Sequence, residues 1–488
     1  MWLDQLDSEI LNIRNQFGHI YYHGFLTGNL DTNRLSELSA IRKSLLERSD
    51  IQEKLTSILA GASSENLSVN EHKRRASLLQ DLLEMERIEG APLFVLYKAD
   101  IQKQENEFTP SFGSNSKGYT ARRKALSSNE SRQFRQEAHK SMYPLLTGIA
   151  NNCHEFIEIA NALSMEQGYS DYFQFRLSQD NLNADEISED LEAVLKVTED
   201  DYLEFLSLAR RVTDTGRVEN YDLPYAQNII LSELDKFYSS NPVSDLKKVL
   251  NSLGIDLNAF PVSIESADTS NAGACFVLGS DDFRLILGSE KGYFGHYVAF
   301  HEFGHALHYS YQPKSVLLSD NGLCLEVMAD FFASVLIDPS WLDEYTLANE
   351  SEITHLLRQK RLSDSYRLRT MVLDTLFERE VFGSPGKSYE TIWSKLSQEI
   401  LMVPDKQAIW DPFCIYRPAY TKNYLYSYFL ANRLAEVRFE RYGSLMKNPR
   451  SLHKVFKEIT ESGNLYPFNE RTKKVGLDSI RLADHIDL

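Results

Sequence analysis

The stretch VAFHEFGHALHYSYQP, from Val298 to Pro313, decides how this chain is interpreted, because it contains two histidines four residues apart. Residues at that spacing lie on one face of a helix, so His301 and His305 could hold one metal ion in an H-E-x-x-H arrangement. Glu302 lies one step around the helix, where a general base could contact a water molecule without binding the metal. Two histidines that only pack on a buried helix face would produce the same sequence pattern, so this stretch alone leaves both interpretations open.

The residues that follow favour a metal. A catalytic zinc site has three protein ligands and one position for water, and Tyr311 stands where the pattern H-E-x-x-H-x-x-G-x-x-H would place a third histidine. The next predicted helix, Leu323 to Ile337, carries two charged residues, Glu326 and Asp330, in an otherwise mostly apolar segment. A buried carboxylate needs a partner, and zinc would partner Glu326, while Asp330 could accept the free ring N–H of a ligating histidine. His308 is expected to pack beside the site, and a structural role for the two carboxylates stays open.

The remainder of the 488-residue chain predicts a mostly α-helical fold, because apolar residues recur at spacings of three and four through most of it. Before the histidine helix, two apolar runs separated by Gly279 to Asp282 predict a small antiparallel β element. A polar stretch from Lys103 to Arg132 predicts a long loop in which a helix starts. We expect a helical N-terminal half over residues 1–262 and a half that contains the chemistry over residues 263–488.

Composition and charge narrow the class of protein. A formal net charge of -18 argues against a nucleic-acid binder, which normally carries a basic face. No apolar run approaches the roughly 20 residues that cross a bilayer, and the acidic N-terminal segment lacks the pattern of a signal peptide. The four cysteines are widely spaced and form no C-x-x-C pair, which indicates reduced thiols. We therefore expect a cytoplasmic protein without nucleic-acid or membrane partners.

A tyrosine-rich segment, RPAYTKNYLYSYFLANRLAEVRFERYG, lies near the C-terminus at residues 417–443. Its Tyr420, Tyr424 and Tyr428 share one face of a predicted helix. Packing in a core or groove is the ordinary explanation for such a run. A phenol from this face could also donate a hydrogen bond to a developing oxyanion. Hydrolysis at a zinc site usually requires such a donor in addition to the metal.

Taken together, the H-E-F-G-H motif at residues 301–305, Glu326 and the tyrosine helix resemble the zinc oligopeptidases, which are gluzincins. This family is typified by thimet oligopeptidase, neurolysin and oligopeptidase F, and angiotensin-converting enzyme is a relative. The segments NAGACF at residues 271–276 and NALSMEQGYSDYFQFRL at residues 161–177 are also similar to family segments. The resemblance spans about residues 150 to 440. It implies a mostly α-helical ellipsoid with a deep, narrow substrate channel that has zinc on its floor, and residues 1–262 would form one channel wall.

The resemblance also implies roles for single residues. His301, His305 and Glu326 would bind one zinc ion per chain, Glu302 would be the general base, and Tyr424 would stabilise the oxyanion. Tyr420 would face the substrate one turn earlier. An edge strand would bind the peptide backbone by strand addition, and glycine would permit its close approach. The residues expected to bind substrate are Asn271, Ala272, Gly273, Ala274 and Arg417.

This chain departs from the family at one position that bears on substrate binding. Pro412 stands where the family has a histidine or lysine, about twelve residues before the oxyanion tyrosine, and Arg417 and Lys422 are the candidate replacements. We expect a zinc-dependent metallopeptidase that hydrolyses short oligopeptides, either internally or as a dipeptidyl carboxypeptidase or carboxypeptidase. The alternative is a catalytically silent zinc-binding relative that acts as a scaffold for a peptide or protein. Glu302 and Tyr424 favour the enzyme, since a silent relative needs neither.

Overall fold

The computed structural model consists mainly of α-helices and contains one small β-sheet. It describes residues 2–27, 30–61, 67–112, 117–257, 260–267, 273–320, 322–346 and 348–486. The prediction of a mostly α-helical fold is confirmed. Within the described ranges, no helix combines the length and the apolar character needed to cross a bilayer.

The part of the chain before the sheet is helical. Its α-helices are α1 (Trp2–Thr27), α2 (Thr32–Leu46), α3 (Ser49–Ala60), α4 (Leu67–Glu89), α5 (Pro92–Glu107), α6 (Gly118–Ser128), α7 (Arg132–Lys140), α8 (Tyr143–Glu166), α9 (Tyr172–Ser178), α10 (Ala184–Val197), α11 (Glu199–Val212), α12 (Leu223–Ser232) and α13 (Pro242–Ser252). The prediction for Lys103 to Arg132 is confirmed in part: a helix does start inside this stretch, as α6 at residues 118–128, but the loop is shorter than predicted because α5 continues to Glu107. Burial of one face of α6, including Tyr119, Ala121 and Leu126, stabilises a helix whose polar sequence has little periodicity.

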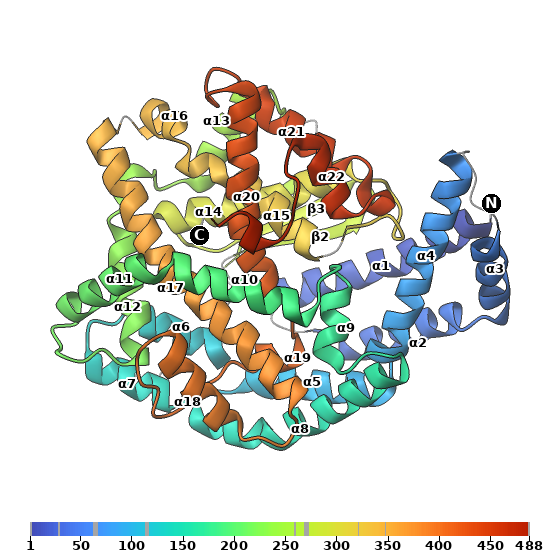
Figure 1. Ribbon diagram of the computed structural model, residues 1–488, viewed down its shortest axis with the longest axis horizontal. Helices are drawn as coiled ribbons and strands as arrows, with labels where there is room; N and C mark the ends of the chain where they lie inside the picture. Colours follow the sequence, from blue (N-terminus) through green and yellow to red (C-terminus); the bar gives the residue numbers. More distant parts are fainter. Residues whose placement is uncertain are drawn as a thin grey trace.

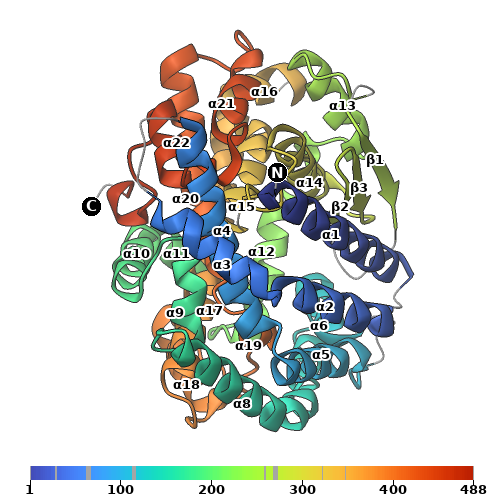
Figure 2. The same ribbon diagram turned by 90° about the vertical axis from the view of Figure 1, so that its right-hand side faces the viewer.

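The chain after the sheet contains a second set of helices. These are α14 (Gly292–Tyr311), α15 (Gly322–Ala333), α16 (Pro339–Trp341), α17 (Glu350–Gly383), α18 (Tyr389–Ile400), α19 (Phe413–Tyr416), α20 (Thr421–Tyr442), α21 (Arg450–Thr460) and α22 (Phe468–Val475). Figure 1 shows α14, α15 and α20 in the upper part of the molecule, α5, α7, α8 and α18 in the lower part, and α1 to α4 at one side. In Figure 2 the long helix α1 lies in front of the sheet and of α14.

The sheet has three strands, β1 (Val262–Ser266), β2 (Gly273–Gly279) and β3 (Asp282–Leu287), in the order β1-β3-β2. The predicted hairpin is confirmed, because β2 and β3 pair antiparallel. The predicted small antiparallel element is antiparallel only in this hairpin, because β1 is a third strand that pairs parallel to β3. The chain passes from β1 to the far edge of the sheet before the hairpin turns back, so β1 and β3 run in the same direction. The sheet is therefore mixed.

The two faces of the sheet pack against different helices because side chains alternate along a strand. Phe283 and Leu285 of β3 belong to the same core as α14 and α15, whereas Ile286 packs with Tyr22 of α1. The Tyr22 hydroxyl donates to Glu265 of β1 over 2.7 Å. This arrangement holds β2 between α1 and the histidine helix α14.

One hydrophobic core connects the described parts of the chain on both sides of residue 262. Its members include Phe156 and Phe205 from the first half and Phe303, Phe332 and Phe456 from the second half. Helices from both halves therefore share one core, whereas α1, α3 and α4 contribute Leu3, Ile51 and Leu79 to a separate hydrophobic cluster. The division into two channel walls at residue 262 stays a prediction.

Candidate metal centre

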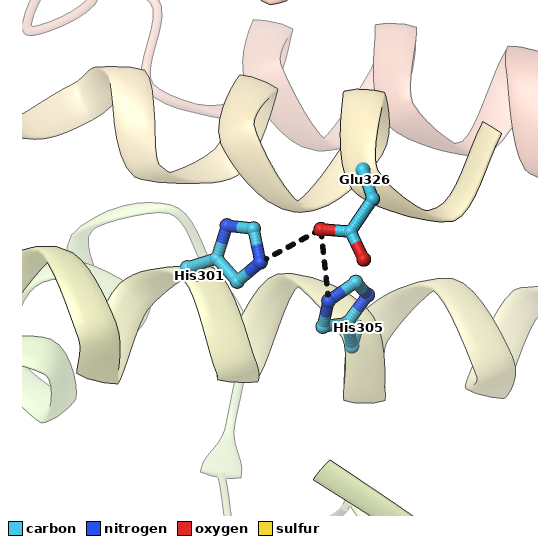
Figure 3. A group of neighbouring side chains, drawn as sticks. All are labelled: His301, His305 and Glu326. Carbon is cyan, nitrogen blue, oxygen red and sulfur yellow. Dashed lines mark ion pairs between the residues drawn. The ribbon is translucent and has the colours of Figure 1, made fainter. Parts of the chain in front are cut away.

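Two neighbouring helices bring His301, His305 and Glu326 together. Both histidines lie on α14 and Glu326 lies on α15, and Figure 3 shows the two imidazole rings and the carboxylate directed toward one another. A side chain at Gly304 would put its Cβ 2.7 Å from the Cα of Ala329, so the glycine lets the two helices approach closely. This approach allows the short Glu326 side chain to reach both histidines.

The distances between the three side chains fit one zinc ion. Oε2 of Glu326 lies 3.2 Å from Nε2 of His301 and 3.7 Å from Nε2 of His305. Ligands about 2.0–2.1 Å from a tetrahedral zinc ion are separated by about 3.4 Å from one another. Oε2 of Glu326 is buried and makes no hydrogen bond of suitable geometry, as expected for atoms that converge on a shared point. The donor set is therefore compatible with zinc.

The protonation of the two histidines differs. Burial lowers the pKa of His305 to about 4, which keeps this ring neutral as a metal ligand must be. Burial acts in the same direction on His301, but its hydrogen bond to Asp330 and its close contact with the carboxylate of Glu326 raise the pKa of His301 well above its usual value. A metal ion would displace a proton from His301, so metal binding should be coupled to proton release.

Asp330 lies at the centre of a hydrogen-bond network behind His301. Its carboxylate accepts from Nδ1 of His301 over 2.9 Å, from the hydroxyl of Tyr297 over 2.6 Å, and from the hydroxyl of Ser427. Burial opposes ionisation, yet the hydrogen bond to His301 holds the pKa of Asp330 below its usual range. The contact has the geometry expected of a residue that orients a ligating histidine, with Nε2 left to face Glu326.

Glu302 lies on the side of α14 that faces strand β2. Burial raises the pKa of its carboxyl to about 7, and the backbone N–H of Cys275 donates a hydrogen bond to it. Gly273 passes close by, since a Cβ there would lie 3.1 Å from Cγ of Glu302 and 2.5 Å from a methyl of Val298. The close approach of the strand therefore requires glycine at this position. Glu302 is outside the three-residue group that could hold the metal.

Two tyrosines of the C-terminal region approach the centre from α20 and the residue before it. The Tyr420 hydroxyl donates to Oε1 of Glu326 over 2.9 Å. The Tyr424 ring lies 5.5 Å from the Tyr420 ring at a steep angle, and burial raises the pKa of both phenols, which keeps them protonated. The structure thus places two hydroxyl donors near the site, and Tyr420 has the more direct contact with Glu326.

The residues expected to bind substrate fall into three groups. Gly273 and Ala274 lie in edge strand β2, whereas Asn271 and Ala272 lie outside the described residues. Arg417 is exposed, and its guanidinium lies 4.0 Å from the centre of the Tyr420 ring. Lys422 was the other residue suggested to bind a substrate carboxylate. This suggestion is wrong, because Lys422 is fully buried and forms an ion pair with Asp180.

A second group of potential ligands lies one helical turn beyond the first. His308, Asp320 and Cys324 are close enough to share an ion. However, Asp320 already accepts from Nε2 of His308 over 2.7 Å and from both terminal nitrogens of Arg471, a buried residue of α22. The guanidinium provides the positive charge that an ion would otherwise supply, so this group is a buried ion-pair cluster.

Two further contacts were not anticipated from the sequence. Tyr297 lies four residues before His301, so its place on the same helix face could have been inferred from spacing. Arg367 of α17 lies over the Tyr297 ring at 5.8 Å, and Tyr297 and Asp330 raise its pKa although burial opposes this. No spacing rule connects Arg367 with the motif, because the two lie on helices that are distant in sequence.

Comparison with known proteins adds no family assignment. No protein-family model matches the chain, and no curated protein matches it in sequence. The resemblance to the zinc oligopeptidases therefore depends on the motif residues and their spacing.

Proposed function

We propose that the chain is a zinc-dependent metallopeptidase that hydrolyses peptide bonds in short oligopeptides. The observation that carries this proposal is the convergence of His301, His305 and Glu326 at separations of 3.2 and 3.7 Å, beside a buried glutamate that is not one of them. A purely structural cluster would not need such a glutamate with a pKa near neutrality.

Each residue of the centre would have a distinct task. A zinc ion bound by His301, His305 and Glu326 would supply Lewis acidity toward the scissile carbonyl and lower the pKa of a water molecule. Glu302 would accept a proton from the attacking water and donate it to the amine that leaves, a task suited to a pKa of about 7. Tyr424 would donate a hydrogen bond to the developing oxyanion, with Tyr420 as the competing donor.

Strand β2 supports a peptide as the substrate. It is an edge strand of the sheet, and the N–H of Cys275 points toward Glu302 and away from β3. In an antiparallel pair, residues two apart direct their backbone groups to the same side, so the groups of Gly273 face Glu302 as well. An extended peptide could pair there and present a carbonyl to the metal, as in strand addition. We also propose that the protein is cytoplasmic and that its helices enclose a substrate channel like that of neurolysin.

Metal analysis combined with Glu302→Gln tests the proposal. The wild-type chain should contain about one zinc per chain, and Glu302→Gln should keep that zinc but lose about 10²–10⁴-fold in kcat because no base remains. Glu436→Gln, on the exposed side of α20, is the matched control and should keep full turnover. Well under one zinc per chain, with no gain on adding zinc, would contradict the metal site. Zinc without turnover of any oligopeptide would instead favour the silent scaffold.

Conservative changes of the two tyrosines distinguish the oxyanion donors. Loss of the donor should lower kcat by about 10²–10³-fold with little change in KM. Tyr424→Phe should show this loss, and Tyr420→Phe should mainly weaken metal binding, because its hydroxyl donates to Glu326. The reverse result would assign the oxyanion to Tyr420.

A further inference from the structure

A cavity of about 700 Å³ lies on the surface of α21, apart from the metal centre. The last residue of α20, the turn after it and α21 itself supply the lining, all within residues 442–461, and we call this cavity the α21 pocket. The opposite side of α21 packs inward, where the buried ring of Phe456 lies 6.3 Å from the ring of His308 and 6.5 Å from that of Phe331. In Figure 1, α21 lies at the top of the molecule, beside the upper end of α20. The pocket is therefore on the outer face of a helix whose inner face contacts α14 and α15.

Four basic side chains line the α21 pocket, namely Lys447, Arg450, Lys454 and Lys457. All four are exposed, and the last three follow one another at spacings of four and three, which places them on one face of α21. Like charges at these spacings repel one another. Because the whole chain has a formal net charge of -18, this group is a local concentration of positive charge on an acidic protein.

The two carboxylates in the lining, Glu458 and Glu461, do not balance these charges. Glu458 pairs over 3.2 Å with Arg441, which is outside the lining. The ammonium group of Lys454, one turn before Glu458, lies instead over the ring of Tyr442 at 5.2 Å. In the parts of the chain that the structure describes, no ion pair joins any of the four basic residues to a carboxylate. Four positive charges therefore share the pocket with Glu461 and with a glutamate that Arg441 already neutralises.

His453 lies among these charges without adding to them. Burial lowers its pKa, and the positive charge of Lys457 lowers it further. Its Nε2 contacts the hydroxyl of Tyr311, the last residue of α14. The imidazole is therefore neutral at pH 7, and it connects the pocket to the end of the histidine helix.

We propose that the α21 pocket binds a small molecule that carries two or more phosphate groups. Lysine binds phosphate as a point charge, and four cations along one face suit more than one phosphate group. Sites for small molecules have volumes of about 300–1,000 Å³, and this cavity is larger than a single phosphate ion would fill. Tyr442 and Pro449 add apolar lining for an organic group. The pocket shares no residue with the proposed zinc ligands, so binding there is independent of the proposed peptidase reaction.

Calorimetric titration of the full chain with inorganic triphosphate, with ATP and with AMP tests this site. Triphosphate and ATP should bind, and AMP should bind at least about 10-fold more weakly, because one phosphate group contacts fewer of the four cations. Tighter binding of ATP than of triphosphate would identify a nucleotide as the kind of ligand, and equal binding would identify an inorganic polyphosphate. The inference is overturned if neither binds at about 1 mM, or if AMP binds as tightly as both.

Variants of two exposed lysines locate the binding. Lys454→Gln and Lys457→Gln should each weaken triphosphate binding about 3- to 10-fold, and the double variant should weaken it at least about 10-fold. Lys395→Gln removes the same charge from an exposed position on α18 and should keep the wild-type affinity. Unchanged affinity in the double variant would place the triphosphate elsewhere, the metal centre included, and would overturn the inference.

A peptide of four glutamates separates phosphate from carboxylate ligands. It should bind the wild type more weakly than triphosphate, because its charges are spread over a longer and more flexible chain. If this peptide binds as tightly as triphosphate and loses affinity in the same double variant, the pocket accepts an acidic peptide. The assignment to phosphate is then overturned.

Discussion

Two buried clusters lie one turn apart on α14, and they differ in what neutralises their carboxylate. In the first, Glu326 faces His301 and His305, and its Oε2 makes no hydrogen bond. In the second, Asp320 faces His308 and is bound by the guanidinium of Arg471. Both clusters contain histidine, carboxylate and a tight packing environment. They differ in one cation contributed by a distant helix.

The comparison teaches that donor residues alone do not make a metal site. A buried carboxylate must be compensated, and a guanidinium and a metal ion are alternative ways to do so. The second cluster connects α14 and the following loop to α22 through Asp320, His308 and Arg471. Among the residues that the structure describes, no guanidinium pairs with Glu326 in the first cluster, and the donor atoms of that cluster point to a common position. We therefore expect metal at the first cluster and none at the second.

The largest effect should come from removing the carboxylate of the first cluster. Glu326→Gln should lower the zinc content well below one per chain and reduce kcat/KM on the order of 10³-fold, because zinc supplies several kcal/mol of transition-state stabilisation. Asp320→Asn is the matched change in the second cluster and should leave zinc content and KM unaltered. Metal analysis and peptide turnover on both proteins measure this. Loss of zinc in Asp320→Asn alone would reverse the assignment of the two clusters.

The next effect concerns Arg471. Arg471→Met should destabilise the fold by about 3–5 kcal/mol, because Asp320 is left as a buried charge without its partner. Urea unfolding of the variant and the wild type measures the loss. Zinc should then restore part of the stability, since His308, Asp320 and Cys324 remain close enough to share an ion. Wild-type stability in Arg471→Met would show that the guanidinium does not compensate the carboxylate.

A smaller effect is expected from Asp330→Asn, which removes the negative charge behind His301 and leaves the three proposed ligands in place. Carboxylates that orient a ligating histidine typically contribute 10–100-fold to metal affinity. Competition with a chelator of known affinity measures the change in zinc binding. Glu350→Gln, at the exposed start of α17, serves as the control. An unchanged zinc affinity would mean that Tyr297 and Ser427 keep His301 oriented without the charge.

Local periodicity accounts for what the sequence could predict. The spacing of four placed His301 and His305 on one face, and the turn from Gly279 to Asp282 predicted the hairpin of β2 and β3. A contact between Asp330 and one of the two histidines was also predicted, since α15 is apolar around its two carboxylates and must bury them; that the partner is His301 comes from the structure. In each case a helix or strand repeat determined which side chains share a face.

Contacts between distant segments could not be predicted in this way. Arg471 lies 151 residues after Asp320, and nothing in the local pattern of either segment indicates the other. The parallel pairing of β1 depends on where the chain returns to the sheet, which composition does not encode. Lys422 was considered a possible substrate contact, yet Asp180, far earlier in the chain, buries it in an ion pair. Charged residues are therefore the hardest to assign from one sequence, because their partners decide their role.

The pH dependence of stability gives the finest test of the second cluster. Burial opposes ionisation of Asp320, but Arg471 and His308 lower its pKa from 3.8 to about 2. Between about pH 4 and pH 2 the folded chain therefore binds fewer protons than the unfolded chain. This group contributes at most about 2 kcal/mol to the free energy of unfolding, which is present above pH 4 and is lost as the pH falls toward 2.

Urea unfolding between pH 2.5 and 6 measures this contribution. Below pH 4, the free energy of unfolding should fall less steeply with decreasing pH in Asp320→Asn than in the wild type. Glu302→Gln in metal-free protein is the control, since burial raises the pKa of Glu302 to about 7 and its titration lies above this pH range. The same pH dependence below pH 4 in the wild type and Asp320→Asn would mean that the charge of Asp320 does not stabilise the fold. The two clusters would then differ only in the geometry of their side chains.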